Sequence, residues 1–169
     1  MNVKTLDSNT EKQPRLPTSE RKVIKSSRTK KTLLSFDVTV DPQNPMPLDR
    51  QRCAALGAAI RKAVSAGTDL RYADLRNQDL RFLNLSGLDL RGADLSGSML
   101  DNSVLAFSNL AEANLRGARM VRGSLAYANL RGACLIGTQF NLVDLTGVLF
   151  WAAEYEATAQ SAERRGSES

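Results

Sequence analysis

The sequence predicts an all-β solenoid, a fold in which short repeated coils stack on one another. An apolar residue recurs at every fifth position from Leu70 to Phe150, which makes seventeen units of five residues. A period of five fits neither an α-helix, which needs about 3.6 residues per turn, nor an ordinary strand, which needs about 2. A small residue also stands two positions before most of these apolar residues, so both side chains point inward along one extended segment. Self-similarity at a fixed period indicates a repeat architecture.

The units share more than an apolar centre. The residue before the centre is mostly Asp or Asn, and Gly often ends the unit, where it suits a chain that turns a corner. The clearest units read ADLRN, ADLSG, ANLRG and ACLIG. The apolar centres are Leu70, Leu75, Leu80, Leu85, Leu90, Leu95, Leu100, Leu105, Leu110, Leu115, Met120, Leu125, Leu130, Leu135, Phe140, Leu145 and Phe150.

These units resemble the pentapeptide-repeat family, whose consensus is A-D/N-L-x-x, over residues 68–152. The resemblance implies a right-handed quadrilateral β-helix with one unit per side and about twenty residues per coil, and hence about four coils. Side chains twenty residues apart should then stack in columns. One inner column is uniformly small and another widens toward the C-terminus: Ala73, Ala93, Ala113 and Ala133, and Leu80, Leu100, Met120 and Phe140.

Residues 1–31 are expected to form a disordered basic leader, because they are rich in Lys, Ser, Thr and Pro and offer little to bury. One interpretation of the basic run is contact with nucleic acid or another polyanion. The other is a solvated tail, since no aromatic residue interleaves to stack bases. The basic residues are Arg21, Lys22, Lys25, Arg28, Lys30 and Lys31.

Residues 32–67 are expected to supply a strand and a helix that cap the open N-terminal end of the solenoid. The alternation of residues 33–40 predicts a strand with one apolar face. Residues 49–66 predict a helix with Asp49 as N-cap and Gly67 after its end. Its apolar stripe would be Cys53, Leu56, Ile60 and Val64.

Residues 153–169 are expected to form a short helical cap followed by a disordered tail. Phe150, Trp151 and Tyr155 stand at this end of the repeats. Either they form a C-terminal cap, or they are the contact of a homodimer, an arrangement that the resemblance implies because family members that act on topoisomerases are dimers of that sort.

Charge and composition indicate which classes of protein are disfavoured. The net charge of +5 divides into +7 for residues 1–67, zero for 68–152 and −2 for 153–169, so the repeats are neutral. No run of about 18 apolar residues predicts a membrane span, and the first residues lack a signal-peptide core, so a cytoplasmic location is expected. The two cysteines are too few for a disulfide framework, and a chain without His disfavours a zinc site.

The sequence contains few residues of the kinds that enzymes use for catalysis. The chain has no His, no G-x-S-x-G, no phosphate-binding Gly-rich loop and no Lys within the repeats, so we expect no enzyme activity and no cofactor. Stacked carboxylates such as Asp69 over Asp89, or Asp74 over Asp94, could suggest a cation site. Because Arg residues alternate with them, a solvated face balanced by arginines is the favoured interpretation.

Outward residues that break the polar pattern predict a binding patch on one half of the rod. Aromatic and apolar side chains together with Arg are typical of protein-binding surfaces. Alternatively, residues 1–47 fold back and cover this surface, with the strand at 33–40 as the cover. The patch comprises Phe82, Val104, Phe107, Arg119, Val121, Arg122, Tyr127 and Leu142.

Three alternative functions are compatible with these features of the sequence. The first is a rigid, non-enzymatic module that binds a protein partner, such as a phage or bacterial modulator of a host system. The second, implied by the resemblance, is a DNA mimic that engages a type II topoisomerase such as gyrase, although the neutral repeats depart from the acidic faces that this needs. The third is nucleic-acid binding through the basic leader, which predicts strong salt dependence.

Overall fold

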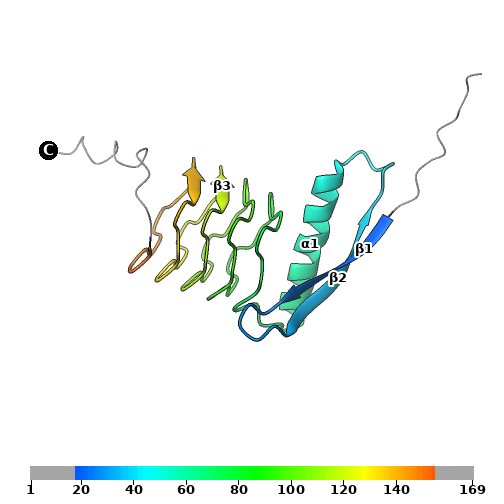
Figure 1. Cartoon of the computed structure of the whole chain (residues 1–169). Coiled ribbons are helices and arrows are strands. Elements are labelled where there is room, and N and C mark those ends of the chain that lie inside the picture. Colours follow the sequence, from blue (N-terminus) through cyan, green and yellow to red (C-terminus); the bar gives the residue numbers. More distant parts are fainter. Residues whose placement is uncertain (1–17, 155–169) are drawn as a thin grey trace, which may run out of the picture.

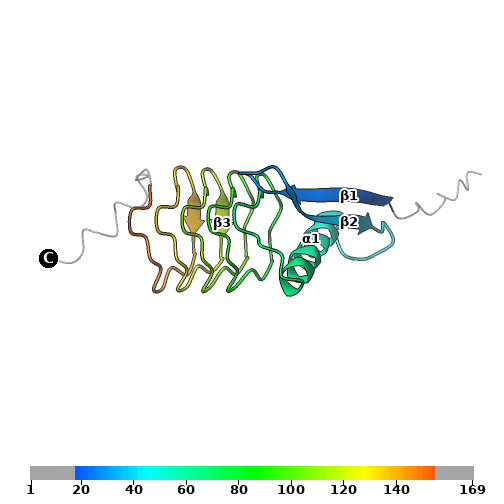
Figure 2. The same ribbon diagram turned by 90° about the horizontal axis from the view of Figure 1, so that it is seen from below.

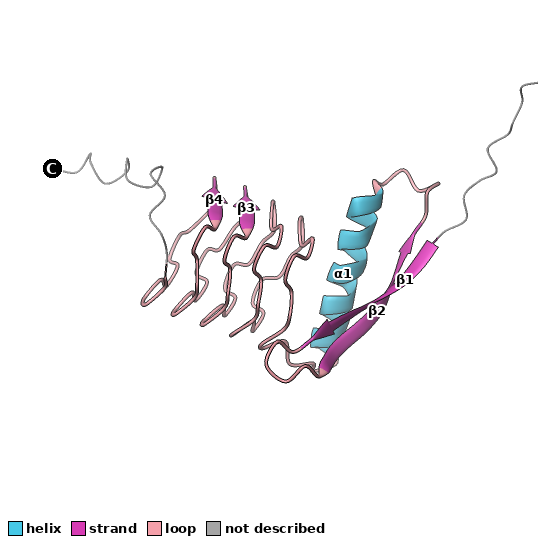
Figure 3. Ribbon diagram, in the orientation of Figure 1, coloured by secondary structure: helices cyan, strands magenta, loops and turns pink. Residues whose placement is uncertain are grey.

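The computed structural model describes residues 18–154 of the chain. A hairpin and a helix come first, and a rod of stacked coils follows, with two short strands on one side of the rod (Figures 1 and 3). No helix in this part of the chain is long and apolar enough to cross a membrane. The elements are β1 (Thr18–Lys25), β2 (Thr32–Val40), α1 (Leu48–Ser65), β3 (Arg119–Val121) and β4 (Gln139–Asn141).

The predicted disordered leader is wrong for residues 18–31. Residues Thr18–Lys25 form β1, which pairs antiparallel with β2 from Thr18↔Val40 onward. Among the residues of β1, only Ile24 is buried. A strand with one buried side chain has no apolar pattern of its own, so its pairing with β2 and its junction with the rod decide its structure. Residues 1–17 of the predicted leader lie outside the described residues.

The predicted strand and helix are present with small differences. In β2 the residues Leu34, Val38 and Val40 are buried, which is the predicted apolar face. Helix α1 has Pro47 as its N-cap without a side-chain hydrogen bond, so the prediction that Asp49 caps it is wrong. Asp49 lies in the first turn and binds Arg81 of the rod at 2.7 Å instead.

One position of the predicted helix stripe is also wrong. Val64 is 39% exposed, whereas the neighbouring Ala63 is buried. Leu56, Ile60 and Ala63 share one core with apolar side chains of the first coil, including Leu83. Helix α1 therefore lies at the N-terminal end of the rod (Figure 2), where its buried residues share a core with those of the first coil.

The coils of the rod repeat every twenty residues. Asp74 pairs with Asp94 and Asp94 with Asn114, and the same parallel offset continues to Cys134 and Glu154. Four units of five residues thus make one turn of the chain. Backbone hydrogen bonds join successive coils; for example, the Leu75 N–H donates to the Asp94 carbonyl at 2.8 Å. Because Glu154 still pairs with Cys134, residues 153–154 continue the coils and do not begin the predicted helical cap.

The interior of the rod contains the side chains that the columns predicted. The alanine column from Ala73 to Ala133 has no exposed surface, and Leu80, Leu100 and Met120 are at most 1% exposed. Buried Ser98, Ser103 and Ser108 each donate a hydroxyl hydrogen bond at 2.7 Å to the carbonyl three residues earlier. This arrangement satisfies the polar atoms that enter the core.

Candidate functional site

The corners of the coils have a backbone conformation that favours glycine. The residue two positions after each apolar centre has φ near +60°, a left-handed conformation that costs energy for a residue with a side chain. Glycine fills eight such positive-φ positions, counting Gly67 before the repeats. Phe107, Tyr127 and Leu142 stand at corners with φ values of 60°, 58° and 57°. Bulky apolar residues there are unfavourable for the fold, so another function for them has to be considered.

Two of these corner residues form a stacked pair on the surface. The rings of Phe107 and Tyr127 lie 5.2 Å apart at an interplanar angle of 9°. They remain 67% and 56% exposed. The Tyr127 ring also lies against Gly147, where an added Cβ would be 2.5 Å from the ring. We call Phe107 and Tyr127 the aromatic ridge.

The side of the rod next to the aromatic ridge has no charged side chain over three coils. We call its outward residues the uncharged face; Val104 at its centre is partly exposed. Its outward side chains are small or polar and none of them is charged. The uncharged face comprises Asn84, Ser86, Val104, Ala106, Ser124 and Ala126.

The other predicted patch residues are distributed around this face. Phe82, Arg122 and Leu142 belong to the corner column at its other border, and Leu142 is 75% exposed. The Arg50 guanidinium of α1 lies 4.0 Å from the centre of the Phe82 ring. Phe82 is therefore engaged with α1 at the N-terminal end.

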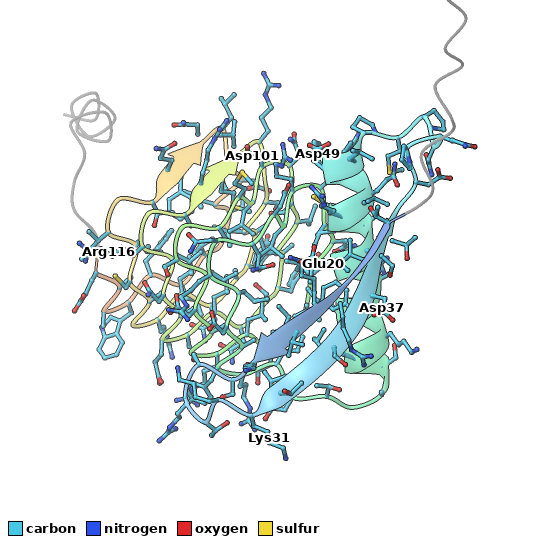
Figure 4. The ribbon with its side chains drawn as sticks, turned by 45° about the vertical axis from the view of Figure 1, so that its right-hand side comes forward. Glu20, Lys31, Asp37, Asp49, Asp101 and Arg116 are labelled. Atoms are coloured by element: carbon cyan, nitrogen blue, oxygen red, sulfur yellow. The ribbon has the colours of Figure 1, made fainter. Side chains whose placement is uncertain are left out.

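Arg119 and Val121 lie on the adjoining side of the rod, in β3. The Arg119 side chain approaches Asp101 at 3.4 Å, and the Val121 N–H donates to the same carboxylate at 3.0 Å. Asp101 lies on the part of the rod near the N-terminal end of α1, where Asp49 is also found (Figure 4). Both patch residues are thus held by contacts within the rod.

The predicted cover does not lie over the patch within the described residues. The hairpin meets the first coil through Ser26, which pairs with Ala73. Ala73 belongs to the unit centred on Leu75, and the uncharged face begins in the unit centred on Leu85, two sides further round the coil. Residues 18–47 therefore leave the aromatic ridge open.

Ion pairs neutralise the acidic residues of the first coils. Asp69 binds Arg71 at 2.6 Å and Asp74 binds Arg76 at 2.7 Å. The hydrogen bonds from these arginines lower the pKa of both carboxyl groups. Further along the rod, the Asn109 amide donates to Asp89 at 3.1 Å. Among the described residues, no group of three or more His, Cys, Asp or Glu side chains could hold a metal ion.

The buried thiol of Cys53 is poorly suited to chemistry. Burial, followed by the contact with the Asp79 carboxylate, raises its pKa to about 12. A thiolate is the reactive form of cysteine, so this thiol is inert at neutral pH. Cys134, the other cysteine, is half-buried and free.

The family model for pentapeptide repeats matches this chain with eight copies, over residues 66–97 and 108–147. Residues 66–97 and 108–147 are pentapeptide repeats. The repeat region is accordingly a right-handed β-helix solenoid, in agreement with the parallel pairing at every twentieth residue. The comparison with curated proteins found no match.

Several solved structures are similar to part of the chain. The pentapeptide-repeat protein alr5209 from Nostoc is 26% identical, with 62% of this chain and 89% of that chain covered and a TM-score of 0.46. AT2G44920 from the thylakoid lumen of Arabidopsis thaliana is 24% identical, with 54% and 72% covered and a TM-score of 0.33. QnrB1, a plasmid-mediated fluoroquinolone resistance protein, is 19% identical, with 55% and 63% covered and a TM-score of 0.23.

Proposed function

We propose that this protein is a non-enzymatic interaction module that binds a protein partner through the uncharged face and the aromatic ridge. The observation that carries the proposal is the stacked, exposed pair of Phe107 and Tyr127 at left-handed corners. Large aromatic residues dominate the binding energy of many protein interfaces.

The fold itself does not require these aromatic residues. Gly87 and Gly147 occupy the same corner column, one coil before and one coil after the aromatic ridge, and both have positive φ. A glycine at positions 107 and 127 would remove the strain of the left-handed backbone. It would cost little buried apolar surface, since both rings lie mostly in solvent. The side chains therefore add a surface property, and a partner would remove both rings from water.

The neighbouring surface suits a broad apolar contact. Val104 and the alanines of the uncharged face offer apolar surface, and Asp144 borders this face on the next coil, where it pairs with Ser124. Arg122 and Leu142 stand at the other border, so an aromatic, an aliphatic and a cationic group surround the uncharged face. Interfaces are enriched in aromatic residues and Arg relative to the rest of the surface.

The test is a double substitution, Phe107→Ser with Tyr127→Ser, in the full chain. We expect recovery of a specific partner from a lysate of the source cells to fall by about tenfold or more, because each such anchor is worth about 2 kcal/mol or more. Quantitative mass spectrometry of the captured proteins measures this. The matched control is Arg116→Ser, which changes an exposed residue on another side of the rod.

The double substitution should not unfold the protein, since both rings are largely in solvent. Circular dichroism and a thermal melt check this. If the aromatic variant and the control recover the same partners in the same amounts, the aromatic ridge is not the binding surface.

The second candidate is a DNA mimic that modulates a type II topoisomerase. The Asp-rich first coils favour it, but the pairing of Asp69 with Arg71 and of Asp74 with Arg76 removes the continuous negative strip that a duplex presents. We therefore place it second. A gyrase supercoiling assay separates the two, because a mimic inhibits or protects gyrase at micromolar protein, whereas a module with another partner does neither.

A further inference from the structure

Within residues 18–154, one edge of strand β1 has no backbone partner over most of its length. Its other edge is paired with β2, and β1 and β2 are the two strands of this sheet among residues 18–154. The Lys25 carbonyl accepts a hydrogen bond at 2.7 Å from the Asp74 N–H of the first coil, so the backbone of Lys25 points away from β2. Because backbone groups alternate along an antiparallel strand, those of Val23, Arg21 and Ser19 point to the same edge.

The backbone of the first coil pairs with this edge of the hairpin over a few residues and then turns away from it. The Ser27 N–H donates to the Tyr72 carbonyl at 2.6 Å, and Ser26 pairs with Ala73. The backbone contacts of the rod with β1 end at Asp74, because the chain turns the next corner at Asn77. Toward Thr18 the hairpin extends away from the rod (Figures 1 and 2). The edge from Ser19 to Val23 is therefore unpaired in the described part of the chain, and such an edge is a template for a further strand.

A groove lies next to Asp74, where the backbone pairing between the first coil and β1 ends. It has a volume of about 450 Å³ and is open to solvent. An extended segment that continued along β1 from this point would enter it. The residues that line it are Val23, Ile24, Lys25, Asp74, Arg76, Asn77 and Gln78.

The surroundings of this edge are positively charged. Lys22 is paired with Glu20 at 2.7 Å, and Arg21 lies opposite Asp37 of β2 without an ion pair between them. Lys25 has no carboxylate partner among residues 18–154. Arg76 is shared between Asp74 and Asp94 at 2.7 and 3.7 Å. The positive charge of Arg21 and Lys25 favours an occupant with carboxylate side chains.

Charge also argues against the two occupants that this chain could supply. Antiparallel pairing with a second copy would place Arg21 opposite itself if centred on Arg21, or opposite Lys25 of the other copy if centred on Val23, and like charges across a strand pair are destabilising. Residues 1–17 carry three basic and two acidic residues, so they do not complement a basic edge. Nucleic acid would match the charge, but it could not use the row of backbone donors and acceptors.

We propose that the free edge of β1 and the adjoining groove bind an extended, acidic peptide segment of a partner protein by β-strand addition. Main-chain hydrogen bonds to Ser19, Arg21 and Val23 hold the segment, and Arg21 and Lys25 select acidic side chains. This surface is two sides of the rod away from the uncharged face and does not depend on it.

Amide hydrogen exchange of the full chain tests whether the edge is free. In dilute protein the outward amides of Arg21 and Val23 should exchange faster than the inward amides of Lys22 and Ile24, which face β2. Protection of the outward amides without any added peptide would overturn the proposal, because residues 1–17 or a second copy would then occupy the edge.

The binding probe is a fluorescent peptide of about twelve residues that alternates Glu with Val and Thr. Fluorescence anisotropy should show binding, and exchange at Arg21 and Val23 should slow in its presence. A peptide with Lys in place of Glu should bind at least about tenfold more weakly. Equal binding of the two peptides, or no binding of the acidic one, would contradict the proposal.

A variant of β1 separates strand addition from simple charge attraction. Val23→Pro removes an outward N–H and leaves the donors to β2 intact, so the hairpin should persist while peptide affinity falls about tenfold. Val23→Thr is the control and should bind as the wild type does. The Phe107→Ser and Tyr127→Ser variant should also bind normally, which keeps this result separate from the proposed function. Unchanged affinity of Val23→Pro would show that backbone pairing is absent and would refute strand addition.

Discussion

Replacing Leu100 by Ala will lower the free energy of unfolding by roughly 2–5 kcal/mol, the range for a large-to-small change in a packed core. Leu100 is 1% exposed and lies in an inner column between Leu80 and Met120. The Leu100 N–H donates to the Arg119 carbonyl at 2.7 Å, and similar bonds fix the spacing of the coils on both sides. Because the coils cannot move together to fill the space, the cavity should persist and the loss should fall in the upper half of this range.

The adjacent residue supplies the control for Leu100→Ala. Met99 is 38% exposed and its side chain points outward from the same segment. Met99→Ala removes a similar amount of apolar volume from the surface, so it should cost less than about 1 kcal/mol. Urea denaturation followed by circular dichroism measures both variants. Equal losses for Leu100→Ala and Met99→Ala would mean that the two side chains do not differ in burial, contrary to the twenty-residue coil.

The sequence predicts the columns of the rod because its period is visible without any knowledge of long-range contacts. Once four units make a coil, Phe107 and Tyr127 must stand one above the other, and the rings are indeed stacked. The same argument predicts the buried alanine column that includes Ala73 and Ala113. Each of these positions depends only on its place in the repeat.

The sequence does not predict the parts of the molecule that depend on contacts between unlike segments. Strand β1 has only Ile24 buried, so its pairing with β2 leaves no hydrophobic pattern to read. Asp49 suits an N-cap locally, but Arg81 of the rod binds its carboxylate. Phe82 fits the aromatic patch by column, yet Arg50 of α1 lies over its ring. Each of these contacts involves at least one segment outside the repeats, so the five-residue period does not predict it.

Two neighbouring positions inside the rod change size in opposite directions, and a comparison of residues twenty apart in the sequence reveals it. Met120 replaces the Leu of its column, and its side chain fills the space that a Cβ at Gly123 would need, since that atom would lie 2.6 Å from the Met120 Cε. The earlier coil has Leu100 and Ser103 at the equivalent positions. A larger side chain at one position therefore goes with the loss of a side chain at its neighbour. In this middle coil the larger side chain takes the space of its neighbour, so little room is left for enlarging another residue.

Replacing Ala113 by Leu should therefore destabilise the protein by about 3 kcal/mol or prevent folding, through overpacking of a filled core. Ala113 has no exposed surface, and Ala93 and Ala133 stack on either side of it with none exposed. The coils are about 4.8 Å apart, so a leucine side chain has no free space along the column. The Ala113 N–H and the Ala113 carbonyl are both bonded within the rod, which prevents the segment from moving outward.

Ala111→Leu is the matched control for Ala113→Leu, because it adds the same atoms two residues away. Ala111 is half-buried on the outer surface of its unit, so the added side chain extends into solvent and should change stability by less than about 0.5 kcal/mol. Thermal and urea denaturation of both variants measure the difference. If Ala113→Leu were as stable as Ala111→Leu, the alanine column would have unused volume, and small residues there would reflect a preference of the chain rather than the dimensions of the coil. A loss for Ala113→Leu alone would show that the width of the rod is set by this column.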